Sequence, residues 1–224
     1  MILVFDLDDT LYDELSYVRS GFWAVARYME ESYGIPGEKV FSLCDRQLQQ
    51  GRSGVFDAVF KALGVYSKKL VRRCLSLYRL HQPQIALYPE AARCLKRLEA
   101  YPLYIVTDGN INAQKNKLTA LCLYNQPPIR RCYLTYRYGV RHSKPSPYCF
   151  QKIAAREGVA NAEVAYIADN PQKDFVGIKP LGFQTIRVFT GQHSMMRKNH
   201  DYEADYAVSS LDDLTEDFLR KVVA

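Results

Sequence analysis

The chain has 224 residues, of which 48% are hydrophobic and 24% are charged, and its formal net charge is +6. This length and composition exclude a disordered chain and allow one globular domain with a smaller insertion. The mild positive charge favours anionic ligands in general, but it does not distinguish a nucleic acid from a small phosphate ester.

The first expected element is a strand at residues 2–5, because Ile-Leu-Val-Phe is a continuous apolar run typical of a strand buried in a parallel sheet. Three aspartates follow it: Asp6, Asp8 and Asp9. One aspartate is ordinary at a strand end, whereas three neighbouring carboxylates repel one another unless a cation or a shared proton relieves them. Ligands bind at the carboxyl ends of strands in open α/β sheets. The cluster therefore indicates a metal site, a nucleophile, or both.

Residues 14–81 are helical by pattern. Apolar residues recur at spacings of three and four between Leu15 and Met29, and Gly34 and Pro36 end this first helix. For Trp23, packing in the core is favoured over a place in a cleft. Three further helices are expected at about residues 38–50, 54–63 and 67–81.

Beyond residue 85 the pattern changes to alternating helices and strands. Helices are expected at about residues 89–100, 111–122, 145–157 and 211–222, and strands at 103–107, 132–136, 164–168, 184–189 and 206–208. Such alternation is typical of an α/β fold, here a Rossmann-like parallel sheet flanked by helices. The predicted domains are a Rossmann-like core formed by residues 1–12 and 85–224, and an all-helical module inserted at residues 13–84.

The six cysteines form no C-x-x-C pair and most lie in apolar runs, which predicts reduced, mostly buried thiols in a cytoplasmic protein. No signal peptide is expected, because Met1 leads directly into a strand. No apolar run approaches the roughly 18 residues that would suggest a membrane span. The arginines are scattered without a nucleic-acid-binding motif, so neither a nucleic acid nor a membrane is an expected partner.

Three further segments carry polar side chains of informative types. They are Thr107-Asp108-Gly109-Asn110, the loop around Lys144, and the stretch that contains Asp169 and Asp174. Taken singly, each has an ordinary explanation as a helix cap, a turn residue or a solvated lysine.

Together with the first segment they form an ordered set: Asp-x-Asp-x-Thr, then Thr, then Lys, then Asp with a second Asp five residues on. This set resembles that of the haloacid dehalogenase (HAD) superfamily, in the phosphatase branch whose helical cap is inserted after the first motif. The resemblance covers nearly the whole sheet domain, including SKPSPYCFQKIAAREGV and YIADNPQKDFVGIKPLGFQTIRV. It implies a hydrolase of phosphoric monoesters with a Rossmann-like core.

The residue types fit hydrolysis through a covalent aspartyl-phosphate. Asp6, the first aspartate of its motif, is the expected nucleophile. Asp8 lies two residues on and points the same way in an extended turn, so it is expected to protonate the leaving oxygen and then to accept a proton from water. Thr107 is expected to offer a hydroxyl to the phosphoryl group, and Lys144 a fixed positive charge to the phosphate and to Asp6.

Two carboxylates beside a phosphate dianion require a cation, and Mg²⁺ prefers a few carboxylates together with phosphate and water. The expected metal ligands are Asp6, Asp8, Asp169 and Asp174, the last of them either directly or from the second shell. Asp9 receives no catalytic role and is expected only to cap or brace the turn.

The expected substrate is a small phosphorylated metabolite. Asp108, Gly109 and Asn110 are the expected binding residues for its phosphoryl oxygens, through the backbone N–H groups of this segment. Selectivity is expected from the cap loop at residues 49–54, where Arg52 would meet a second anionic or hydroxyl-rich group. The alternative is that the glycines of this loop only break helices and that Arg52 is solvent-exposed.

A phosphosugar is slightly favoured, because the loop is polar and has no aromatic pair for a base. A nucleoside 5′-monophosphate is the alternative, and a phosphoglycolate-like acid is also compatible. The dehalogenase branch usually lacks an aspartate at the position of Asp8, since a leaving halide needs no proton. A receiver-type signalling domain would have about half this length, and nothing in the sequence favours a non-catalytic phospho-ligand-binding protein.

Overall fold

The computed structural model describes residues 1–223, and the chain divides into two compact units. The core unit consists of Met1–Glu14 and Ala86–Ala224, and the helical unit consists of Leu15–Ile85. Near the points where the chain leaves and re-enters the core unit, the Tyr88 N–H donates a hydrogen bond of 2.9 Å to the Leu11 carbonyl. The helical unit is therefore an insertion whose flanking segments are held together.

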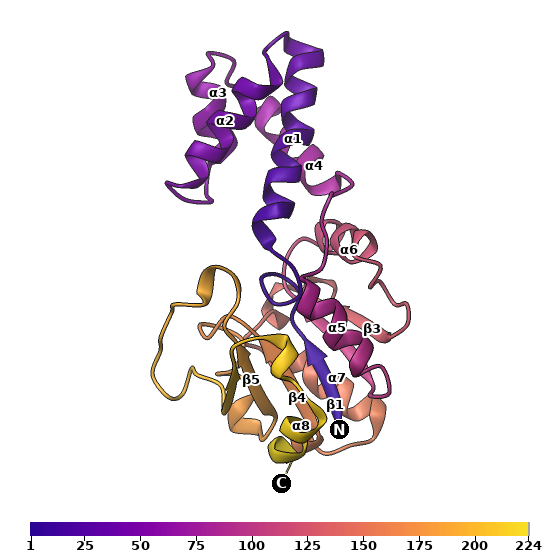
Figure 1. Cartoon of the computed structure of the whole chain (residues 1–224). Coiled ribbons are helices and arrows are strands. Elements are labelled where there is room, and N and C mark those ends of the chain that lie inside the picture. Colours follow the sequence, from indigo (N-terminus) through magenta and orange to yellow (C-terminus); the bar gives the residue numbers. More distant parts are fainter. Residues whose placement is uncertain (224) are drawn as a thin grey trace. The chain divides into compact units, whose positions relative to one another are not determined.

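The core unit is built on a six-stranded sheet, in which every pair of neighbouring strands is parallel (Figure 1). The strands are β1 (Ile2–Phe5), β2 (Leu103–Thr107), β3 (Ile129–Leu134), β4 (Val164–Ala168), β5 (Gln184–Val188) and β6 (Tyr206–Val208). Their order in the sheet is β3-β2-β1-β4-β5-β6. This order confirms the predicted Rossmann-like parallel sheet. From β1 the chain adds β2 and β3 on one side and then β4, β5 and β6 on the other. Ligands bind in such sheets at this switch point, between β1 and β4.

Strands β1, β2 and β4 are buried along their whole length, which explains their continuous apolar sequences. Side chains on one face of the sheet pack with Phe150 and Ile153 of a following helix in one hydrophobic cluster. The helices of the core unit are α5 (Pro89–Arg97), α6 (Ile111–Ala120), α7 (Tyr148–Glu157) and α8 (Glu216–Val223). The packed sheet fixes the strand ends, and with them the side chains that follow each strand.

Several element boundaries differ from the prediction, and three of the differences show why. Strand β3 begins at Ile129 rather than 132, because Arg130 and Arg131 are exposed and hide the start of the strand in the sequence. Helix α7 begins at Tyr148 rather than 145, since a proline disfavours helical geometry in the residue before it and this segment holds two prolines. The expected last helix is divided into a short 3₁₀ turn at Leu211–Asp213 and α8.

The helical unit contains α1 (Glu14–Tyr33, which starts in the core unit), α2 (Gly37–Leu48), α3 (Val55–Ala62) and α4 (Lys68–Leu80). Aromatic side chains form its interior, with Phe56 in edge contact with Phe22 and Tyr78 at ring distances of 6.0 and 5.9 Å. The expectation of a core position for Trp23 is wrong: its side chain is 39% exposed and stacks on Phe41 at the surface. Its neighbour Phe22 takes the inward-facing position of α1 instead.

All six cysteines lie among the described residues as free thiols, and all but Cys122 are buried. Within residues 1–223 we find no helix with the length and apolar character needed to cross a bilayer.

Candidate active site

Three buried carboxylates meet at the reversal point of the sheet. Asp6 directly follows β1 and Asp169 directly follows β4, and the parallel pairing of these strands brings both to the same edge. The Asp6 N–H donates to the Ile167 carbonyl of β4 at 2.9 Å, which fixes this end of β1. Asp174, in the turn after β4, completes a group in which one carboxylate oxygen from each residue lies within 4.8 Å of the other two.

Lys144 joins two members of this group. Its Nζ lies 2.8 Å from Asp6 Oδ1 and 2.8 Å from Asp174 Oδ1, and its side chain is 1% exposed. It also donates to the Tyr166 hydroxyl at 2.9 Å. Burial opposes the charge on Lys144, but the Asp174 and Asp6 carboxylates raise its pKa well above the ordinary value. The lysine is therefore a fixed cation at this site.

One lysine does not neutralise three buried carboxylates. Burial raises the pKa of Asp6 to about 8, with the Lys144 charge opposing the rise and the Asp174 charge adding to it. Burial also raises the pKa of Asp169. Full ionisation of this set of hard oxygen donors would put excess negative charge in a small buried volume, and a divalent cation of the Mg²⁺ type would offset it. Asp6, Asp169 and Asp174 are the side chains that would hold the ion.

Both oxygens of Asp169 are oriented by neighbouring side chains. The Thr10 hydroxyl donates to Oδ1 at 3.0 Å, and His193 Nδ1 lies 2.8 Å from Oδ2. Thr10 belongs to the first motif, whereas His193 comes from the loop after β5 and was not anticipated. No pattern in the sequence around His193 marks it as part of the site.

Asp9 braces the first turn, in the role expected for it. Its φ of 58° is left-handed, and its carboxylate accepts the Glu14 N–H at 3.0 Å. The Thr190 hydroxyl donates to its carbonyl at 2.6 Å. The backbone at Gly191 comes so close that a Cβ there would lie 2.2 Å from the Asp9 Cβ, so this contact requires glycine. Asp9 thus ties the first motif to the loop that carries His193.

The Asp8 carboxylate is not part of the group formed by Asp6, Asp169 and Asp174. Its Oδ1 lies 2.7 Å from Lys117 Nζ and accepts the Tyr12 hydroxyl at 2.5 Å, and its Oδ2 accepts Gln114 Nε2 at 2.8 Å. Burial alone would raise the pKa of Asp8, but the Lys117 charge and these hydrogen bonds lower it overall. The geometry does not support the expected metal-ligand role of this side chain, because its counter-charge comes from helix α6.

Most side chains at the end of β2 and just after it are hydrogen-bonded to other parts of the protein. The Thr107 hydroxyl is buried and accepts Gln114 Nε2 at 2.5 Å. Asp108 Oδ1 accepts the Thr135 hydroxyl at 2.7 Å and the Lys144 N–H at 3.2 Å. The Asn110 side chain caps α6 by accepting two backbone N–H groups, both at 3.2 Å.

Gly109, between these residues, has a φ of 125°, a conformation that favours glycine. The Asp108 and Asn110 side chains are thus engaged within the protein. Binding of a phosphoryl group by this segment through its backbone N–H groups stays a prediction.

A second lysine lies near Asp108. Lys173 Nζ is 3.5 Å from Asp108 Oδ2, and its side chain is 36% exposed. Partial desolvation and the nearby Lys144 charge lower its pKa, but the charges of Asp6 and Asp174 raise it overall. It sits in the turn between Asp169 and Asp174. No spacing in the sequence marks Lys173 as a site residue, because a lysine in a polar turn is usually solvated.

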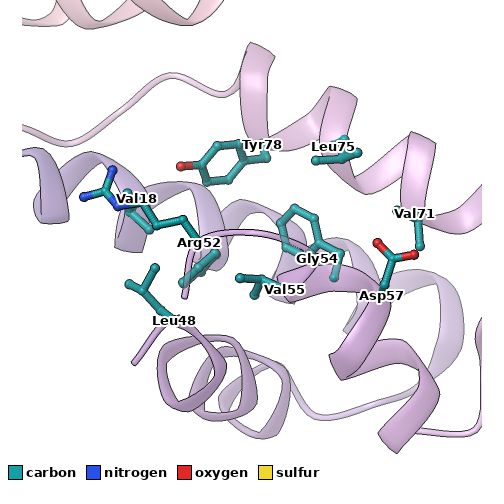
Figure 2. Close-up of a pocket in the computed structure, with 11 residues that line it drawn as sticks. Val18, Leu48, Arg52, Gly54, Val55, Asp57, Val71, Leu75 and Tyr78 are labelled. Atoms are coloured by element: carbon teal, nitrogen blue, oxygen red, sulfur yellow. The ribbon is translucent and has the colours of Figure 1, made fainter. Parts of the chain in front are cut away.

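Arg52 lies in the exposed turn between α2 and α3, within the helical unit. There it borders a cavity of about 180 Å³, whose walls are largely apolar (Figure 2). The lining side chains include Phe22, Leu48, Asp57 and Tyr78. The exposure of Arg52 fits the alternative in which the glycines of this loop only break helices and Arg52 faces solvent. Contact between Arg52 and a substrate stays a prediction.

Comparison with known proteins identifies the family. The family model described as haloacid dehalogenase-like hydrolase matches residues 1–182. Glyceraldehyde 3-phosphate phosphatase of Methanocaldococcus jannaschii is 29% identical over 224 residues, which cover 96% of this chain and 95% of that protein. The protein of the same name from Methanopyrus kandleri is 27% identical over 89% of this chain and 88% of its own length.

Solved structures share the fold at lower identity. A 2-haloacid dehalogenase from Pseudomonas syringae aligns with a TM-score of 0.67 and 21% identity over 99% of this chain and 100% of its own. A HAD phosphatase from Thermococcus onnurineus aligns with a TM-score of 0.60 and 22% identity over 100% of this chain and 97% of its own. These likenesses show the fold, and the match over residues 1–182 shows that the chain belongs to the haloacid dehalogenase-like hydrolases.

Proposed function

We propose that this chain is a Mg²⁺-dependent phosphatase that hydrolyses a small phosphosugar through an aspartyl-phosphate on Asp6. The main support for the proposal is that Asp6 and Asp8, two carboxylates of the first motif, lie in different surroundings. Asp6 lies in the buried group with Lys144, Asp169 and Asp174, whereas Asp8 is held apart by α6. Covalent phosphoryl transfer needs this division, with one carboxylate to attack and another to move the proton.

In the first step an Asp6 oxygen attacks phosphorus, and the ester P–O bond breaks with its electron pair on the leaving oxygen. Asp8 is ionised in the substrate-free protein, because Lys117 and its hydrogen bonds lower its pKa. It takes up a proton from solvent before this step and gives it to the leaving oxygen, so the alcohol departs neutral. In the second step water attacks the phosphorus of the aspartyl-phosphate and passes a proton to Asp8, which restores both carboxyl groups. Lys144 stabilises the negative charge that collects around phosphorus. When bound by Asp6, Asp169 and Asp174, Mg²⁺ would offset the charge of the phosphate.

The substrate class is inferred from the two relatives that match nearly the whole chain, both named glyceraldehyde 3-phosphate phosphatase. A phosphoserine phosphatase of Thermus thermophilus is 32% identical over 107 residues, which is 47% of this chain and 41% of that protein. The full-length matches favour a short phosphorylated aldehyde or sugar over an amino-acid phosphate.

A panel of phosphate esters assayed with Mg²⁺ tests the proposal. We expect the highest kcat/KM on glyceraldehyde 3-phosphate or another small phosphosugar, above phosphoserine, phosphoglycolate and nucleoside 5′-monophosphates. A preference for nucleotides would reject the phosphosugar assignment. Halide release from 2-chloropropionate without phosphate release from any ester would reject the phosphatase activity itself.

We further propose that the helical unit is a cap that selects the substrate, with Arg52 as a contact. Arg52→Ala should then lower kcat/KM for the phosphosugar about 10- to 150-fold, the equivalent of a charge-assisted hydrogen bond of about 1.5–3 kcal/mol. Its kcat/KM for p-nitrophenyl phosphate should stay unchanged, because the nitrophenyl group offers Arg52 no anionic or hydroxyl partner. Steady-state kinetics on both esters measures the difference.

Arg46→Ala is the matched control, since Arg46 is another exposed arginine of the helical unit, on α2. It should behave as wild type on both esters. If Arg52→Ala changes neither ester, or lowers both equally together with the melting temperature, Arg52 is not a substrate contact.

A further inference from the structure

Side-chain donors hold both oxygens of the Asp8 carboxylate. Lys117 and Tyr12 bind Oδ1, and Gln114 binds Oδ2. Rotation of the carboxylate about its Cβ–Cγ bond would break contacts on both oxygens at once. Asp8 is therefore fixed in one orientation, although its side chain is still 20% exposed.

Lys117 is an unusual residue for this position. Its side chain is only 5% exposed, and a buried ammonium group is costly unless carboxylates pair with it. Its Nζ lies 2.7 Å from Asp8 and 3.9 Å from Glu14 Oε1. A lysine that served only to fill this face of α6 would be replaced at lower cost by an apolar side chain.

Helix α6 brings Lys117 and Gln114 to Asp8 together. The two residues are three positions apart, so they project from the same face of the helix. The Asn110 cap fixes where α6 begins, directly after β2. Gln114 is 2% exposed, and its Nε2 donates to Asp8 and also to the Thr107 hydroxyl. One helix thus connects the second motif to the proton-transfer carboxylate of the first.

We propose that Lys117 and Gln114 are positioning residues that hold Asp8 ready for proton transfer to the leaving oxygen and from the attacking water. The inference rests on the proposed phosphatase activity. Proton transfer requires the carboxyl group within about 2.6–3.2 Å of the reacting oxygen. Because contacts on both oxygens fix its orientation, the Asp8 carboxyl group can stay within this distance without changing rotamer.

The leaving group distinguishes this role from a purely structural one. An alkyl ester such as glyceraldehyde 3-phosphate needs a proton on its leaving oxygen, whereas p-nitrophenolate leaves without one. Since kcat/KM reports the steps up to phosphoryl transfer, a displaced Asp8 should affect the two esters differently. The second step needs Asp8 as a base with either ester, so its slowing should let the aspartyl-phosphate accumulate.

The test compares Lys117→Met with wild type on both esters. We expect kcat/KM for glyceraldehyde 3-phosphate to fall about 100-fold, the usual effect of a misplaced catalytic group. For p-nitrophenyl phosphate kcat/KM should change little, while rapid mixing shows a burst of nitrophenolate close to one per protein. Gln114→Leu should show the same pattern with a smaller loss, and Lys117→Arg should recover part of the activity.

Lys115→Met is the matched control, because Lys115 is an exposed lysine of the same helix. It should match wild type in both assays. Equal losses on the two esters without a burst, or no loss in either variant, would overturn the positioning role. If Lys117→Met does not fold, Gln114→Leu decides by the same criterion. Wild-type protein that releases phosphate from neither ester would instead reject the proposed function.

Discussion

Asp6→Asn should abolish phosphate release, with a loss in kcat of about 10⁴-fold or more, as for other catalytic nucleophiles. An amide lacks the anionic oxygen that attacks phosphorus, so no acyl-phosphate can form. The substitution also removes the negative charge that lies 2.8 Å from Lys144, although the Lys144–Asp174 pair stays available. Phosphate release from p-nitrophenyl phosphate and mass spectrometry of acid-quenched protein together measure turnover and the covalent intermediate.

Asp8→Asn provides the contrast. It should slow turnover about 10²–10⁴-fold, the usual worth of general acid–base catalysis. Because p-nitrophenolate leaves without a proton, this variant should still become phosphorylated, whereas Asp6→Asn should never carry the phosphoryl group. Near wild-type rates in Asp6→Asn would show that another residue is the nucleophile. Melting temperatures of both variants identify any loss that comes from misfolding.

Removal of divalent metal should have an effect of similar size. Chelation followed by dialysis is expected to abolish turnover, and added Mg²⁺ to restore it. The phosphate would otherwise approach three buried carboxylates, each with an oxygen within 4.8 Å of an oxygen of the other two. Ca²⁺ should restore less activity, since it takes more ligands at longer distances than Mg²⁺. Calorimetric titration of the metal-free protein measures binding independently of catalysis.

Asp169→Asn is the variant for that titration. It removes one carboxylate from the group, and we expect Mg²⁺ affinity to fall by more than the roughly 10- to 100-fold that loss of an outer-shell partner costs. Asp201→Asn is the control, because Asp201 is largely exposed and is not part of this carboxylate group. It should bind Mg²⁺ like wild type. Full activity after rigorous metal removal would contradict the proposed mechanism.

The sequence predicted the sheet well because its strands carry their own signal. β2 and β4 are continuous apolar runs, and their observed bounds match the expected residues 103–107 and 164–168. The wrong boundaries occur where local chemistry competes with the pattern. The exposed Arg130 and Arg131 hide the start of β3, and two prolines delay the start of α7.

The site was predictable where residues share a motif and poorly predictable where tertiary structure supplies a partner. The identity of the counter-ion for Asp8 depends on how α6 packs, which no local spacing reveals. The sequence does contain one indication that α6 contributes buried polar side chains. Gln114 and Lys117 fall on the same helix face as the buried Ala113 and Leu118, so a helical projection would have marked two polar residues as buried.

The hydrogen bond between Tyr88 and Leu11 has a consequence for how such a protein can change over time. It holds together two points of the core chain that flank the whole inserted segment. A segment bounded in this way can be lengthened, shortened or replaced by recombination without rerouting any strand of the sheet. If the helical unit selects the substrate as proposed, the phosphate chemistry and the substrate preference can evolve separately.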